Sequence, residues 1–101
     1  MSERFSDVYR RHVGYVREGD IAAAVGDMHP DGLSAGIDGV KVPTEKVASA
    51  DIRSVRAGDG EAVGETVYTM ADGSVIGLRS IWTLESGRWL AVRLENFDVE
   101  A

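Results

Sequence analysis

The fold is decided by residues 61–99, EAVGETVYTMADGSVIGLRSIWTLESGRWLAVRLENFDV. Apolar and polar side chains alternate through this stretch, and turn sequences interrupt it at Asp72-Gly73 and Glu85-Ser86-Gly87. A period of two is typical of half-buried strands, and glycine-containing turns join such strands into antiparallel hairpins. Together with a turn at Gly58-Asp59-Gly60, the pattern predicts a four-stranded antiparallel meander. Its strands are expected at about 47–57, 61–71, 74–84 and 88–99.

The chain before this meander follows a helical period instead. Residues at spacings of three and four form one stripe that consists of Phe5, Val8, Tyr9, His12 and Val16. Gly19 supplies a left-handed stop, and Asp20 is a good N-cap for a second helix that runs to His29-Pro30. Two helices followed by a meander must pack helix on sheet, so the predicted fold class is α+β.

The stretch between the helices and the long strands is predicted to form a short hairpin. Leu33, Ala35 and Ile37 alternate with small or polar residues, Asp38-Gly39 is a hairpin turn signal, and Val40 and Val42 resume the alternation. Residues 43–50 then leave room for one further helical turn at most.

Composition limits the classes of function. The 101 residues are 44% hydrophobic and 28% charged, which is typical of one globular domain. No cysteine is present, so disulfides and thiolate metal sites are excluded. The net charge of −6 disfavours binding to nucleic acid and to anionic membranes. A charged N-terminus and the lack of a long apolar run favour a cytoplasmic protein.

The order of these signals resembles the nuclear-transport-factor-2-like superfamily, which includes ketosteroid isomerases and SnoaL-like polyketide cyclases. The residues that carry the resemblance are the helix ending in Glu18-Gly19-Asp20, the short helix running into His29-Pro30-Asp31, and the final strands Gly77–Leu84 and Arg88–Val92 with one tryptophan each. The resemblance implies a cone in which a bent sheet wraps a helix and encloses a pocket. It also implies a shortened member, because the family's third helix has no room here.

His12 is the first candidate for chemistry. It lies on the apolar stripe of the first helix, where an imidazole can act as a general acid or base near neutral pH. Alignment with a ketosteroid isomerase places it where that family keeps an oxyanion-stabilising tyrosine. The alternative is a partly buried histidine that bonds a backbone carbonyl.

Asp38 and Ser80 are further candidates by the same alignment. Asp38 lies two residues after the position of the isomerase base, although an Asp-Gly pair is also an ordinary hairpin turn. Ser80 occupies the position of the second oxyanion donor, which is a protonated aspartate in the isomerases. The serine and the displaced carboxylate put literal ketosteroid isomerase activity in doubt.

One sheet face is expected to line the pocket. Leu78, Ser80, Trp82 and Leu84 alternate along one strand, and the matching face of the last strand carries Leu90, Val92, Leu94, Asn96 and Asp98. This face turns from apolar to polar, as a pocket with a few polar groups does. Trp82 and Tyr15 are expected as pocket walls, with Asn96 beside the substrate and Asp98 as an alternative carboxylate. Core packing is the alternative for Trp82, and a solvated strand end for Asn96 and Asp98.

The opposite face mixes charged and apolar residues, among them Arg79, Arg93, Glu95 and Phe97. The resemblance implies a two-fold homodimer through this outer face, with a solvated face as the alternative. No metal site is expected, since His12 and His29 lie on different helices without a carboxylate cluster.

The expected function is therefore that of a cofactor-free acid/base enzyme on an apolar, carbonyl-bearing or polyketide-like small molecule, by isomerisation, cyclisation or epoxide opening. The alternative is a non-catalytic ligand-binding or dimerisation module of the same fold. Support for both comes mainly from the resemblance.

Overall fold

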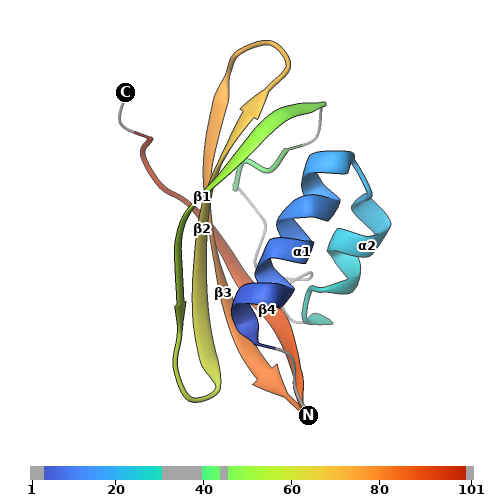
Figure 1. The fold of residues 1–101 in the computed structure, drawn as a ribbon, viewed down its shortest axis with the longest axis vertical. Helices are drawn as coiled ribbons and strands as arrows, with labels where there is room; N and C mark the ends of the chain where they lie inside the picture. Colours follow the sequence, from blue (N-terminus) through green and yellow to red (C-terminus); the bar gives the residue numbers. More distant parts are fainter. Residues whose placement is uncertain (1–3, 31–39, 44–45, 100–101) are drawn as a thin grey trace.

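The computed structural model describes residues 4–30, 40–43 and 46–99. Two helices, α1 (Phe5–Glu18) and α2 (Ile21–Gly26), precede four strands, which are β1 (Val47–Ala57), β2 (Glu61–Met70), β3 (Val75–Glu85) and β4 (Arg88–Asn96). Both helices lie on one side of the sheet (Figure 1). The predicted α+β arrangement of helices packed against an antiparallel meander is confirmed.

The first helix forms where the apolar stripe predicted it. Its buried side chains are Phe5, Val8, Tyr9, His12 and Val13. The helix ends at Gly19, whose φ of 78° is the left-handed conformation that glycine adopts at little cost. Asp20 then caps α2, because its carboxylate accepts a hydrogen bond from the Ala23 N–H at 3.3 Å.

The second helix is shorter than predicted, and its expected end at His29-Pro30 is wrong. It stops at Gly26, and the next residues run beside β4 instead. The Ala91 N–H donates to the Asp27 carbonyl at 2.8 Å, and the His29 N–H donates to the Ala91 carbonyl at 2.7 Å. β4 is an edge of the sheet, so its unpaired backbone groups compete successfully with another helical turn.

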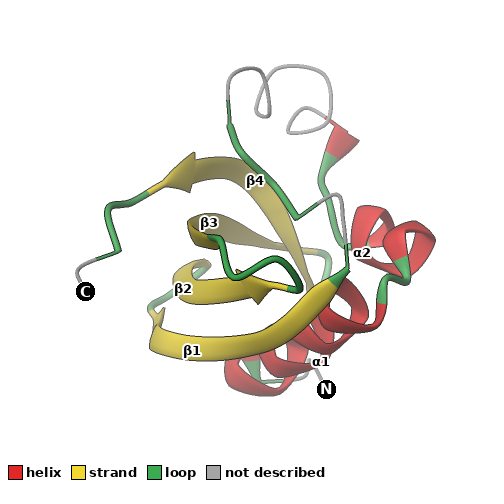
Figure 2. Ribbon diagram, turned by 90° about the horizontal axis from the view of Figure 1, so that it is seen from above, coloured by secondary structure: helices red, strands yellow, loops and turns green. Residues whose placement is uncertain are grey.

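The sheet is a meander in the order β1-β2-β3-β4, with every neighbouring pair antiparallel. The predicted strands agree with the observed ones to within a few residues. Figure 2 shows that the sheet is curved, with α1 and α2 against one face. This helix-covered face is called the inner face below, and the opposite face is called the outer face.

A bulge in β4 changes which of its residues face the helices. Ile81 pairs with Arg93 whereas Trp82 pairs with Ala91, so Val92 is the extra residue. An extra residue exchanges the two faces of a strand. Trp89 and Ala91 therefore join Trp82 on the inner face before the bulge, and the expectation that Leu90 and Val92 do so is wrong. After the bulge, Leu94 and Asn96 lie on the inner face, as expected.

The core fills the space between α1 and the inner face. Phe5 makes ring contacts with Tyr9, Trp82 and Trp89, at centroid distances from 5.3 to 5.6 Å. Tyr9 lies directly over Gly64 of β2, where any side-chain carbon would overlap the tyrosine ring. Glycine at this position lets α1 approach the sheet.

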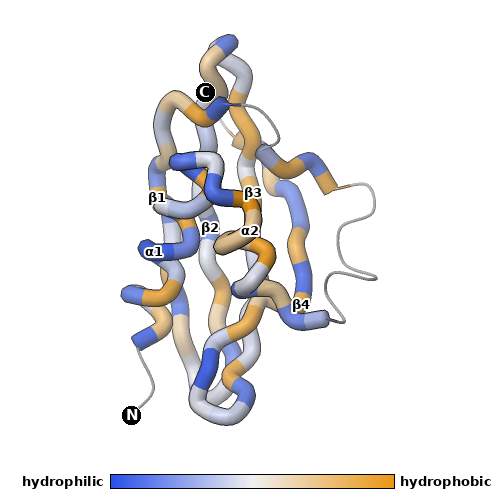
Figure 3. The backbone as a smooth tube through the Cα atoms, turned by 90° about the vertical axis from the view of Figure 1, so that its right-hand side faces the viewer, coloured by the Kyte–Doolittle hydropathy of each residue, from blue (hydrophilic) through white to orange (hydrophobic). Residues whose placement is uncertain are grey.

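The outer face carries a row of ion pairs within one chain. Arg79 donates to Glu65 through Nε at 2.9 Å and lies 3.6 Å from Glu95 through Nη1. Arg93 lies 3.4 Å from the same Glu95 carboxylate. Figure 3 shows the alternation of hydrophobic and hydrophilic residues along β4 that places such charges opposite the core.

Two expectations fall partly outside the described residues. Most of the hairpin predicted around Asp38-Gly39 lies in 31–39, outside the described residues, while Val40 and Val42, which were expected to continue it, belong to no strand. Within 43–50, the stretch considered for a helical turn, residues 47–50 belong to β1. In the part of the chain that the structure describes, no helix has the length and apolar character needed to cross a membrane.

Candidate functional site

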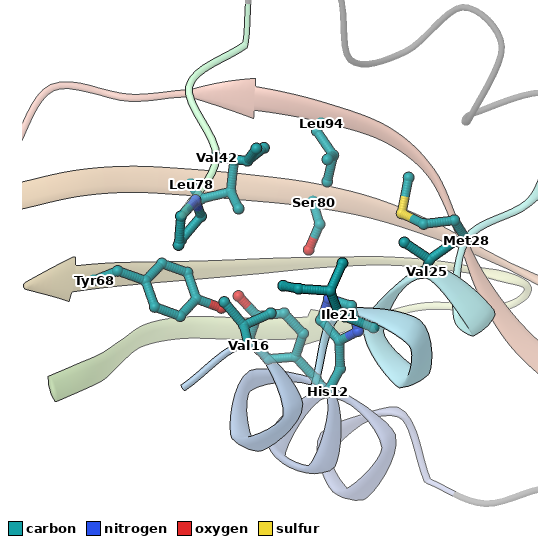
Figure 4. Close-up of a pocket in the computed structure, with 13 residues that line it drawn as sticks. His12, Val16, Ile21, Val25, Met28, Val42, Tyr68, Leu78, Ser80 and Leu94 are labelled. Carbon is teal, nitrogen blue, oxygen red and sulfur yellow. The ribbon is translucent and has the colours of Figure 1, made fainter. Parts of the chain in front are cut away.

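A cavity of about 310 Å³ lies between the two helices and the inner face of the sheet (Figure 4). This volume is at the lower end of the range for small-molecule sites. Most of its wall is aliphatic. The lining residues are Tyr9, His12, Val16, Ile21, Ala24, Val25, Met28, Val42, Pro43, Tyr68, Leu78, Ser80 and Leu94.

One residue of this wall, His12, is held by a buried carboxylate behind it, that of Asp27. His12 Nδ1 lies 3.0 Å from Asp27 Oδ2, and both side chains are about nine-tenths buried. The pair joins the middle of α1 to the residue that ends α2. The His12 ring also meets Trp82 edge to face at 5.1 Å, so its orientation is fixed from two sides.

Arg88 supports the carboxylate from the start of β4. Its Nη2 donates to the Gly26 carbonyl at 2.8 Å and lies 3.9 Å from Asp27 Oδ1. The backbone of Asp27 is held as well, through its bond from the Ala91 N–H. Asp27 is therefore anchored independently of His12, which suits it to position the imidazole.

Ser80 places a hydroxyl in the cavity. The Trp82 indole N–H donates to Ser80 Oγ at 2.7 Å, and the Tyr9 hydroxyl is a second hydrogen-bonding neighbour of the serine. Figure 4 shows this hydroxyl pointing into the space between the helices and the sheet.

Two buried tyrosines complete the polar lining. The Tyr9 hydroxyl is 2.6 Å from Thr66 Oγ1. Burial raises the pKa of Tyr9 above its ordinary value, although the hydrogen bond with Thr66 lowers it. Burial also raises the pKa of Tyr68, and the neighbouring Tyr9 adds to this. Both phenols therefore stay protonated at neutral pH and can serve as hydrogen-bond donors.

The structure brings together only part of the residue set predicted from sequence. His12 and Ser80 line the cavity. Trp82 is fully buried behind them and is not among the lining residues, and Tyr15 is not among them either. Asp38 lies outside the described residues.

Asn96 and Asp98 lie away from the cavity wall. Asn96 instead binds residues 40–43 to the sheet, accepting from the Lys41 N–H at 2.7 Å and donating to the Lys41 carbonyl at 2.9 Å. Asp98 follows β4 and is exposed.

Sequence reasoning missed Asp27, Tyr9 and Tyr68 as site residues, although a signal existed for each. Asp27 follows Ala24 by three residues, so it shares the buried side of the second helix, where a carboxylate needs a partner. Tyr68 lies an even number of residues from Ala62 and Met70, which are apolar residues of the same strand, so alternation assigns it to the inner face. Tyr9 belongs to the apolar stripe of the first helix, and a buried tyrosine hydroxyl needs a hydrogen-bond partner.

Within the described ranges, no three histidine or carboxylate side chains are grouped so that they could hold a metal ion. Comparison with protein-family models, with curated proteins and with solved structures finds no significant match to this chain.

Proposed function

We propose that this chain binds a small apolar, carbonyl-bearing molecule in the cavity and that His12 moves a proton on it. The observation that carries the proposal is the His12–Asp27 hydrogen bond in an otherwise largely aliphatic wall. Buried imidazole–carboxylate pairs are expensive to desolvate and are a common arrangement for general acid/base catalysis.

The pair supports a specific division of roles. An ionised carboxylate only accepts hydrogen bonds, so in the neutral imidazole the bond to Asp27 places the ring proton on Nδ1. Nε2 then keeps its lone pair, and no described residue bonds to it. In the proposed reaction, Nε2 takes a proton from a carbon next to the carbonyl and returns it to another carbon. The Ser80 O–H donates to the oxygen on which negative charge develops.

The finer fold belongs to the same proposal. We infer the cone-shaped, nuclear-transport-factor-2-like arrangement, supported by a curved antiparallel sheet with both helices on one face and a cavity between them. In this shortened form, His12 on α1 and Ser80 on β3 supply the polar groups, with Asp27 as the carboxylate.

A non-catalytic ligand-binding module is the second candidate. The observation that favours it is that Tyr9 and Ser80 are already hydrogen-bonded to Thr66 and Trp82, so much of the polar wall is satisfied internally. Such a wall suits an apolar ligand that is only held.

Proton transfer is tested with a bicyclic apolar ketone, 2-tetralone. Exchange of its α-protons with D₂O is followed by proton NMR. The protein is expected to accelerate exchange above the buffer rate, and His12→Gln is expected to reduce that acceleration by about 10²- to 10⁴-fold. Glutamine keeps a polar side chain that can still bond Asp27, so the fold is expected to survive.

His29→Gln is the matched control. His29 also pairs with a carboxylate, Glu85 at 2.7 Å, but it does not line the cavity. Its substitution is expected to leave exchange unchanged. Acceleration that survives His12→Gln would exclude His12 as the base. If 2-tetralone bound but its proton exchange were not accelerated, the result would favour the second candidate, a non-catalytic ligand-binding module.

A further inference from the structure

Tyr68 has an unusual environment for a buried tyrosine. It lies on the inner face of β2, its side chain is only 2% exposed, and it lines the cavity. Among the described residues, no hydrogen bond reaches its hydroxyl, in contrast to the Tyr9 hydroxyl, which is bonded to Thr66. Tyr68 therefore presents an unused donor to the interior.

The space that this hydroxyl borders is the cavity. In the described part of the chain, every side-chain nitrogen or oxygen that is completely sealed has a partner. The Tyr68 oxygen has none, so it keeps contact with open space, and the cavity is the space its residue lines. A hydroxyl that faces a cavity without a protein partner can donate to any ligand that brings an acceptor to it.

The charges around the cavity restrict the ligand. Among the described residues that line the cavity there is no lysine or arginine, and the His12 imidazole is already paired with Asp27. An anionic ligand would have no counter-ion there, and a cation would meet hydroxyl donors with raised pKa values. A neutral ligand with a hydrogen-bond-accepting oxygen is the class that fits.

We propose that the Tyr68 hydroxyl recognises the acceptor oxygen of a neutral, mostly apolar ligand and thereby selects ketones over hydrocarbons of the same shape. Figure 4 shows Tyr68 at one end of the cavity and Met28 at the other, with Ser80 and His12 between them. An oxygen held at Tyr68 therefore directs the hydrocarbon part past His12 toward the Val25 and Met28 side chains. This inference rests on the ligand class of the proposed function but not on its proton transfer.

The test compares two ligands that differ only by the oxygen. Dissociation constants of 2-tetralone and of tetralin, its hydrocarbon counterpart, are measured by NMR titration. The unsubstituted protein is expected to bind the ketone more tightly. Tyr68→Phe removes one oxygen and keeps the ring, so it is expected to weaken ketone binding by about tenfold and to leave tetralin binding unchanged. Thermal melting of the same samples checks that the variant is folded.

Thr69→Val is the control variant, because it removes a hydroxyl from the outer face of the same strand. It is expected to bind both ligands like the unsubstituted protein. The inference would be overturned if Tyr68→Phe and the unsubstituted protein bound the ketone with equal affinity. It would also be overturned if the substitution weakened the binding of both ligands equally, or if the unsubstituted protein bound neither ligand. If Tyr68→Phe weakened the binding of the ketone alone, while the unsubstituted protein did not accelerate α-proton exchange, the role of Tyr68 would be supported and catalysis by His12 contradicted. If exchange depended on His12 while Tyr68→Phe kept its affinity for the ketone, only the proposed role of Tyr68 would be contradicted.

Discussion

At the scale of single residues, the polar groups around the cavity differ in how far they are satisfied. Trp82 donates to Ser80, Tyr9 is bonded to Thr66, and His12 uses Nδ1 on Asp27. These bonds hold the side chains in place without using every polar atom. What remains for a ligand is the Tyr68 hydroxyl and His12 Nε2, two groups from two different elements.

The buried tyrosines predict a loss of stability in alkaline solution. The folded-state pKa values of Tyr9 and Tyr68 are raised by burial, whereas in the unfolded chain both groups ionise near 10. Their contribution is fully present below pH 10 and is lost as the pH rises further, because only the unfolded state then releases protons easily. The melting temperature is therefore expected to fall steeply above pH 10.

Tyr68→Phe should make this decline shallower, since phenylalanine has no proton to release. The measurement is thermal melting between pH 8 and pH 11.5, with tyrosinate absorbance at 295 nm recorded on the same samples. Tyrosinate from these two residues should appear together with unfolding. A Tyr68→Phe variant that declines as steeply as the unsubstituted protein would contradict the role of Tyr68 in this pH dependence.

At the scale of elements, periodicity and turn chemistry were sufficient to predict most boundaries. The first helix and all four long strands were located from the spacing of their apolar residues together with the glycines that lie between them. The face of β4 could not be predicted, because residues 89–92, Trp-Leu-Ala-Val, are all apolar and fit either register. The contact of Trp89 with Phe5 of α1 belongs to the observed register, and such a tertiary contact is not visible in local sequence.

Residues 40–43 are attached to the sheet by the packing of Val40 and Val42 against the core and by hydrogen bonds from one side chain, Asn96. Asn96 makes two hydrogen bonds with the Lys41 backbone and donates a third to the Gly77 carbonyl at 3.1 Å. Asn96→Ala removes all three and is expected to destabilise the protein by about 1–3 kcal/mol. Because Val42 and Pro43 line the cavity, ketone binding should weaken as well.

Hydrogen exchange of the Lys41 amide is the direct readout for this variant, since that N–H donates to Asn96. Exchange at Lys41 should become faster in Asn96→Ala. Asp98→Ala is a suitable control two residues away, at an exposed position after β4. Unchanged Lys41 protection in Asn96→Ala would show that the segment is held by other contacts.

At the scale of the whole molecule, the layer arrangement follows from the order of the elements, but the cavity does not. A meander with two leading helices has one inner face, and residues such as Ser80 could be assigned to it from alternation. The cavity exists because α2 stops at Gly26 and the following residues turn onto β4, which brings Asp27 to His12. That turn depends on hydrogen bonds with the outer edge of β4, which comes last in the sequence, so local patterns could not reveal it.

The outer face leads to the final prediction, a two-fold homodimer. The charged side chains of this face form ion pairs within one chain, between Arg79 and both Glu65 and Glu95, and between Arg93 and Glu95. Apolar side chains such as Ile81 lie half-buried beside them. Four strands of about ten residues span about 33 Å by 19 Å, and a standard interface buries about 800 Å² per partner. The flat area of the face is therefore about 630 Å², which corresponds to an interface somewhat below the standard size. The charges of Arg79, Arg93, Glu65 and Glu95 are already paired before association.

Light scattering at micromolar concentration is expected to give about twice the 10.9 kDa mass of one chain. Ile81→Glu places a carboxylate in the middle of the outer face, where a two-fold axis would bring two copies of it together, so this variant should be monomeric. Val55→Glu adds the same charge at an exposed position on the inner side of β1 and should leave the dimer intact. If the unsubstituted protein has only the single-chain mass, the outer face is a solvated surface. The ion pairs of Arg79 and Arg93 then serve only to cover the apolar residues beside them.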